Sequence, residues 1–175
     1  MRYPTIRLIL TLMVLLAPVA GYAEDFTLAM AVPLKDDIRT IRFETKEHVP
    51  SFHVVLTNTA GKDLRIWQSG NSWGYGNLSF EWMGKDGKTL RLERGLRVWY
   101  WNFASYLTLT PGEQHVFDVW FPDDWKNVPS SVREGDEVTL RAVFSIPPDK
   151  NPEKLGVWSG TVRSPEVKVV VQDAR

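Results

Sequence analysis

Apolar and polar residues alternate with a period of two along most of the chain. Every second residue is apolar from Phe52 to Leu56, and again from Val138 to Phe144. Successive side chains of a strand point to opposite faces, so this pattern is typical of half-buried antiparallel strands. No window shows a convincing amphipathic helix longer than two turns. The alternation occurs in residues 26–31, 40–45, 51–58, 64–67, 78–82, 89–92, 115–121, 137–144 and 167–171. It predicts about nine strands.

Turn-forming residues separate these segments. Residues 84–88 contain Asp86-Gly87 and predict a hairpin, and Pro111-Gly112 fits the centre of a type II turn. Short strands with such turns predict one antiparallel two-sheet sandwich. Two loops are long, residues 122–136 and 147–156, and long loops at the ends of a sandwich often carry function.

Three short motifs resemble those of immunoglobulin-like sandwiches in bacterial exported proteins: FHVVLTNTAGKDLRIW, LTLTPGE and LRAVF. Similar motifs occur in the proteinase-inhibitor type called BsuPI and in many uncharacterised secreted domains. The resemblance covers roughly residues 26–171 and implies a single immunoglobulin-like antiparallel β-sandwich of about nine strands. The shared motifs shape turns between strands and carry no chemistry, so the resemblance assigns no role to any single residue. Proteinase inhibition is one function it suggests, with residues 147–156 as the candidate loop.

The N-terminus predicts export. Residues 1–7 carry Arg2 and Arg7, residues 8–19 are almost wholly apolar, and small residues precede Glu24. This is the pattern of a signal peptide, residues 1–23, cleaved after Ala23 and leaving residues 24–175 as one domain. The alternative is an uncleaved membrane anchor, but the apolar run is shorter than the roughly 20 residues that span a bilayer. We therefore expect a periplasmic or secreted protein with no membrane span after cleavage.

Composition argues against several functions. The chain has 21 basic and 21 acidic residues, so nucleic acid and anionic lipid are not expected partners. It has no cysteine, which excludes thiol chemistry and disulfides. The histidines His48, His53 and His115 lack metal-binding spacing, and no GxSxG motif is present. The acidic pairs at 36–37 and 123–124 fit solvated turns. We expect no enzymatic activity, cofactor or metal; an enzyme would instead show a cleft with convergent Asp, Glu or His groups.

One stretch, RVWYWNFASYLTLTPGE at residues 97–113, holds five aromatic rings within its first ten residues. As a strand, it would place Trp99, Trp101 and Phe103 on one side. Five exposed rings would exceed the largest apolar patch of a typical monomer, so most of them should be covered. Tyr100 and Tyr106 are the rings expected to remain outside.

A second aromatic stretch spans residues 67–77. Its glycines shape a tight loop, and its amides supply hydrogen-bond donors and acceptors. Two interpretations follow: Trp73 and Tyr75 plug the core, or the loop is a sugar platform. Alternation also predicts that Trp67 and Trp120 face outward, whereas Trp82 is expected in the core.

The leading prediction is a non-enzymatic extracytoplasmic binding module that contacts a protein partner in the cell envelope. A carbohydrate-binding module is the first alternative, with a glycan as its ligand, and a proteinase inhibitor is the second. The predicted ligand-binding residues are Trp67, Gln68, Asn71, Trp73, Tyr75, Tyr100 and Trp120.

Overall fold

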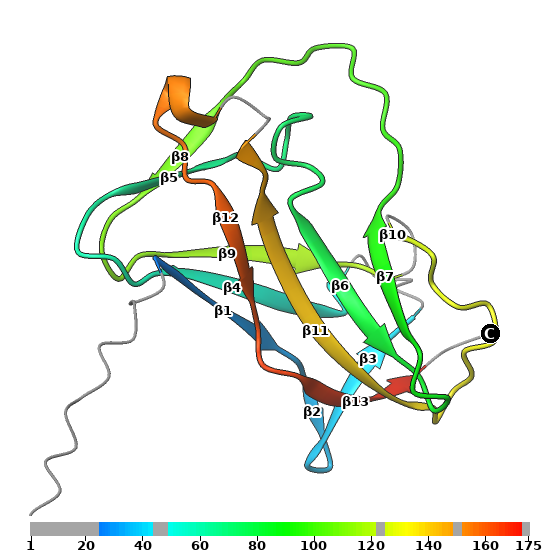
Figure 1. The fold of residues 1–175 in the computed structure, drawn as a ribbon. Helices are drawn as coiled ribbons and strands as arrows, with labels where there is room; N and C mark the ends of the chain where they lie inside the picture. The colour runs from blue at the N-terminus through cyan, green and yellow to red at the C-terminus, as the bar shows by residue number, and fades with distance from the viewer. Residues whose placement is uncertain (1–24, 44–48, 122–124, 149–151, 173–175) are drawn as a thin grey trace, which may run out of the picture.

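The computed structural model describes residues 25–43, 49–121, 125–148 and 152–172. These residues form an all-β fold (Figure 1). The strands are β1 (Phe26–Ala31), β2 (Leu34–Lys35), β3 (Ile38–Arg42), β4 (Phe52–Asn58), β5 (Leu64–Trp67), β6 (Leu78–Met83), β7 (Thr89–Arg94), β8 (Tyr106–Leu109), β9 (Gln114–Val119), β10 (Trp125–Lys126), β11 (Glu137–Ile146), β12 (Gly160–Arg163) and β13 (Val167–Gln172). A 3-10 helix, η2 (Pro152–Leu155), precedes β12.

The strands form two main layers and a small pair. One layer is the three-stranded sheet β1-β4-β9, and the other has the order β10-β7-β6-β11-β13-β3-β2, with β12 also paired to β11. β5 and β8 form a separate two-stranded sheet near the upper end of Figure 1. The layers pack against each other as in a β-sandwich, and the sheets do not close into a barrel.

Aromatic rings join the two layers. Phe52 on β4 lies with its ring centroid 5.4 Å from that of Phe80 on β6, and Phe121 lies within 5.7 Å of both. All three are fully buried. Trp82 is buried as well, which confirms its predicted place in the core. A cysteine-free chain therefore holds its layers together by aromatic packing.

β11 is the central strand of the large sheet. It pairs with β6 along one edge, and along the other edge it pairs first with β13 and then with β12. Ser164 closes the break between those two strands, because its backbone N–H donates to Ala142 O and its Oγ accepts from Ala142 N, both at 2.9 Å. β11 thus stays hydrogen-bonded on both edges.

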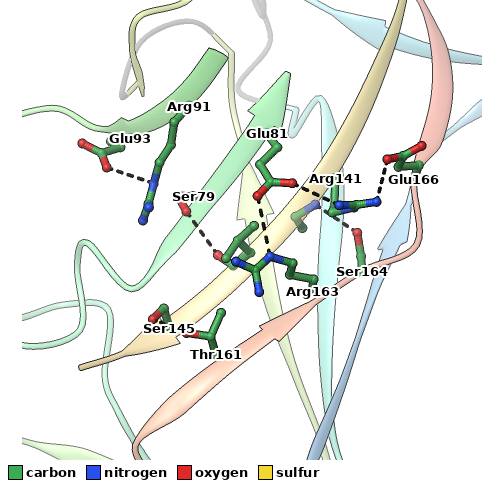
Figure 2. Close-up of polar contacts among 12 residues, drawn as sticks. Ser79, Glu81, Arg91, Glu93, Arg141, Ser145, Thr161, Arg163, Ser164 and Glu166 are labelled. Atoms are coloured by element: carbon green, nitrogen blue, oxygen red, sulfur yellow. Dashed lines mark hydrogen bonds and ion pairs between the residues drawn. The ribbon is translucent and has the colours of Figure 1, made fainter. Parts of the chain in front are cut away.

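The outer face of this sheet is polar, and its charged side chains form ion pairs with one another (Figure 2). The Arg141 guanidinium contacts Glu166 at 2.6 Å and Glu81 at 3.3 Å, and Arg163 contacts Glu81 at 3.6 Å. Ser145 and Thr161 share a hydrogen bond of 2.8 Å beside them. These pairs are partly exposed and reached by solvent, so each stabilises the fold only weakly. The face is a solvated surface.

The strand prediction is confirmed in outline. Each of the nine predicted segments overlaps a strand, although residues 40–45 do so only in part, because β3 ends at Arg42 and residues 44–45 lie outside the described ranges. Residues 84–88 form the turn of the β6–β7 hairpin, with Gly87 at φ 71°. Gly112 has φ 82°, as a type II turn requires. Two features differ. β2, β8, β10 and β12 were not predicted, and β3 pairs with β13 in parallel, so the large sheet is mixed. The signal segment, His48 and the acidic pair at 123–124 lie outside the described residues.

Asn58 ties the three-stranded sheet to the β5–β8 pair. Its buried Nδ2 donates to Leu109 O at 2.8 Å and Lys62 O at 2.9 Å, and its Oδ1 accepts from Ala60 N at 2.9 Å. Asn58→Ala should lower the free energy of unfolding by about 2–4 kcal/mol, because it leaves buried backbone groups without partners. Urea unfolding of residues 24–175 measures this. Lys62→Ala, which keeps its carbonyl, should change stability by less than about 0.5 kcal/mol; equal effects would contradict the role of Asn58.

Candidate functional site

The segment between β7 and β8, residues 95–104, is here called the strap. It arches over the upper end of the molecule in Figure 1, away from both sheets. It forms no strand, and its backbone makes no hydrogen bond to the backbone of another described residue. Only at Ser105, where the chain approaches β8, does a carbonyl accept a backbone N–H, that of Gln68 at 3.1 Å.

The strap exposes most of its large side chains. The exposed fractions are 94% for Leu96, 76% for Val98, 90% for Tyr100, 83% for Trp101 and 74% for Phe103. The prediction that most of the rings are covered is therefore wrong. The alternation placed Trp99, Trp101 and Phe103 on one side of the segment. That side can be buried only where another layer of the protein packs against it. The upper end of the sandwich supplies none for this segment.

The loop of residues 68–77 anchors the end of the strap through the side chain of Asn71. Asn71, which is buried, donates from Nδ2 to Ser105 O at 3.1 Å and to Ser105 Oγ at 2.9 Å. Its Oδ1 accepts from Trp73 N and Gly74 N, both at 3.0 Å. All of these partners belong to the protein, so the Asn71 amide shapes the loop of residues 68–77 and joins it to the end of the strap.

Two further contacts join the loop to the strap. Asn102 Oδ1 accepts from Ser72 N at 3.0 Å, and its Nδ2 donates to Ser72 Oγ at 2.8 Å. Ser105 Oγ donates to Gln68 Oε1 at 2.8 Å. The two aromatic stretches of the sequence are thus one structural unit, in which the loop supports the strap from below.

Trp99 is the strap ring that turns inward. Its ring meets Tyr75 edge-on with centroids 5.6 Å apart. The Arg97 guanidinium lies 5.1 Å from the Trp99 ring and 5.7 Å from the Tyr75 ring. Arg94 lies 4.7 Å from the ring of Trp125, which is buried in the core. The Arg97 contacts therefore connect the strap to the loop of residues 68–77, whereas Arg94 is the last residue of β7 and joins that strand to the core.

The predicted ligand-binding residues divide into exposed and inward-facing side chains. Trp67 was predicted to face outward but is only 2% exposed, because Trp73 from the loop covers that side of β5 with rings 6.2 Å apart. Asn71 is buried too, and Trp73 packs against the core, as the plug interpretation expects. The structure places Tyr75 and Trp120 half-buried, and Gln68 and Tyr100 exposed. Ligand binding by these residues stays a prediction.

The predicted ligand-binding residues did not include Leu96, Val98 or Asn102 of the strap. One signal was available: no acidic residue occurs between Glu93 and Glu113, whereas charged residues of both signs alternate through most of the chain. A long apolar stretch with only basic charges is unusual on a solvated loop.

Two clefts of about 380 Å³ and 520 Å³ flank Lys85, at the end of the β6–β7 hairpin far from the strap. Lys85 Nζ lies 3.0 Å from Asp136 Oδ1, and the Arg133 N–H donates to Asp136 Oδ2 at 2.8 Å. The Arg133 N–H, followed by Lys85, holds the pKa of Asp136 below its ordinary value. The carboxylate is thus a structural acceptor within its own turn. Among the described residues, no group of three His, Asp or Glu side chains could hold a metal ion.

Comparison with known proteins adds no relative. No protein family matches the chain, and no curated protein is significantly similar to it. Separately, none of the helices in the described segments has the length and apolar character needed to cross a membrane.

The exposure of the strap predicts a contrast in stability. Trp101→Ser should change the free energy of unfolding by less than about 0.5 kcal/mol, because its ring contacts mainly water. Trp67→Ala should lower it by about 3–5 kcal/mol, because it leaves a cavity in the core. Urea unfolding of both variants checks this. A loss above about 2 kcal/mol for Trp101→Ser would mean that the ring is covered.

Asp136 gives a pH prediction. A carboxyl whose pKa is lower in the folded state stabilises the fold above its unfolded pKa, and this stabilisation is lost as the pH falls through the folded value. Asp136→Asn should therefore be less stable than the wild type at pH 7, and the gap should narrow below about pH 4. Unfolding at a series of pH values measures it. A stability gap for Asp136→Asn that stays constant with pH would refute the assignment.

Proposed function

We propose that this chain is a non-enzymatic extracytoplasmic binding module, an immunoglobulin-like sandwich that presents the strap to a protein partner in the cell envelope. Its N-terminal segment is proposed as a signal peptide that directs export. The observation that carries the proposal is the exposure of five large apolar side chains on a base held by hydrogen bonds. A preformed, fully exposed apolar surface of this kind is typical of an interaction site.

The size of the exposed surface supports a protein partner. Each large aromatic side chain offers about 150–250 Å², so Tyr100, Trp101 and Phe103 together expose roughly 400–600 Å². That alone reaches the largest patch of a typical monomer, before Leu96 and Val98 are included. A standard protein interface covers about 800 Å² on each partner, which the strap and its flanks can supply.

The strap backbone favours protein over lipid. Its N–H and C=O groups have no backbone partner among the described residues, and unpaired backbone groups are costly within a bilayer. A protein partner can hydrogen-bond them. Tyrosine and tryptophan are also enriched in protein interfaces, because they combine a large apolar area with a polar group.

The contacts of the described residues weigh against the carbohydrate-binding alternative. A sugar platform needs free amides beside flat rings, but Asn71 is buried with four internal hydrogen bonds and Gln68 Oε1 accepts from Ser105. For proteinase inhibition the candidate loop is residues 147–156. There Arg65 Nη1 donates to Leu155 O at 2.9 Å and ties the end of η2 to β5.

Site-specific photocrosslinking in the producing cell tests the proposal. A photoreactive phenylalanine analogue replaces Trp101 or Phe103 in one strain each, and Thr161 on the polar outer face in the control strain. We expect a discrete adduct of one mass from the strap positions and none from position 161. The partner identified in the adduct, once purified without the crosslink, should bind the Trp101→Ser variant at least tenfold more weakly than the wild type, because a central aromatic anchor is lost.

Two results would count against the proposal. Equal adducts from the strap and from position 161 would show that the strap has no dedicated protein partner. Retardation of the mature chain by a polysaccharide gel, abolished in a folded Trp101→Ser variant, would favour the carbohydrate-binding alternative.

A further inference from the structure

We infer that the partner binds by strand addition: an extended segment of its chain pairs with the open edge of β8 and continues along the exposed rings of the strap. This inference rests on the proposed function and specifies how the partner is held. Strand addition obtains affinity from backbone hydrogen bonds and specificity from alternate side chains. It therefore requires an unpaired strand edge next to side-chain contacts, and β8 leads directly out of the strap.

The register identifies the open edge. β8 is hydrogen-bonded to β5 alone within the described chain, with Tyr106 opposite Trp67. Ser105 O accepts from Gln68 N, so Ser105 and every second residue after it turn their backbone groups toward β5. The N–H and C=O groups of Tyr106 and Thr108 consequently face away from β5. No strand in the described ranges pairs with them.

This edge lacks the usual protection. Strand edges are normally blunted by charged residues, prolines or very short strands. The large sheet follows this rule, since its order ends at β10 and β2, each of two residues. From Val98 to Thr110, by contrast, the chain has no charged residue and no proline. The edge of β8 is four residues long and carries neither a charge nor a proline that would block pairing with another chain.

The surrounding charges indicate the chemistry of the segment. Arg65 from β5 lies over the ring of Tyr106, the first residue of β8, at 4.6 Å, and Arg97 in the strap lies 5.1 Å from the Trp99 ring. The strap and β8 contain no acidic residue. The segment that fits is therefore extended, apolar at alternate positions, and carries at least one Asp or Glu. A second copy of this chain fits less well, because it would bring the same two arginines to this surface.

A backbone-specific variant tests the inference. Thr108→Pro removes the outward N–H of an exposed edge position and leaves the groups that face β5 intact, so β8 should still form. Thr108→Val is the matched control, because it changes the side chain and keeps the N–H. The probe is a phage-displayed library of random nine-residue peptides, selected on the wild-type mature chain.

We expect enriched peptides with alternating apolar residues and an acidic residue. They should bind Thr108→Val like the wild type and Thr108→Pro at least tenfold more weakly. Amide hydrogen exchange of the wild type gives a second measurement that needs no variant. Exchange at Tyr106 and Thr108 should slow when such a peptide binds.

Several results would overturn the inference. These are enrichment of no peptide, enrichment of peptides insensitive to Thr108→Pro, or unchanged exchange at both amides. A wild-type dimer that Thr108→Pro converts to a monomer would identify a second copy as the occupant instead. Crosslinking at Trp101 with a partner that binds Thr108→Pro normally would reject strand addition and leave the proposed function standing.

Discussion

The packing of Phe52 against Phe80 and Phe121 is the interaction on which the rest of the structure depends. It joins β4 of the three-stranded sheet to β6 of the large sheet at the centre of the core. Aromatic pairs in such edge-on geometry add to the burial of their area, and the chain has no disulfide to share this role. The strap can stand off the fold because none of its residues belongs to the buried core cluster.

Buried amides connect this core to the surface. Asn58 fixes the end of β4 to β8, and Asn71 fixes the loop of residues 68–77 to the start of β8. Each amide has both its donor and its acceptor satisfied within the protein. Buried polar groups that are fully paired specify one geometry, whereas partly paired groups destabilise the fold. The position of β8, and hence of its open edge, is set from both ends by side chains that contact no ligand.

The sequence predicted the strands well because a period of two is a local property. Residues 52–58 and 137–146 carry their inward and outward faces in their own order, so no distant residue was needed. The parallel pairing of β3 with β13 could not be found in this way, because it joins segments far apart in the chain. The prediction that Trp101 is covered was wrong for a similar reason. Alternation shows which residues share a side, and only the tertiary fold shows whether that side is covered. Trp67 is the converse case, a ring at the end of β5 that was predicted to face outward and that Trp73 covers from the loop that follows.

The strap and the outer face of the large sheet show two different ways of meeting water. On the outer face, Arg141, Glu81 and Glu166 satisfy one another and need no partner. On the strap, Asn102 and Trp99 face the body while the remaining rings are largely exposed. If the strap served only to connect β7 to β8, polar residues would do so without exposing apolar area or an unprotected edge. Asn71 and Asn102 hold this apolar segment in place, and an apolar surface that is both exposed and anchored is the reason why we propose a partner that covers it.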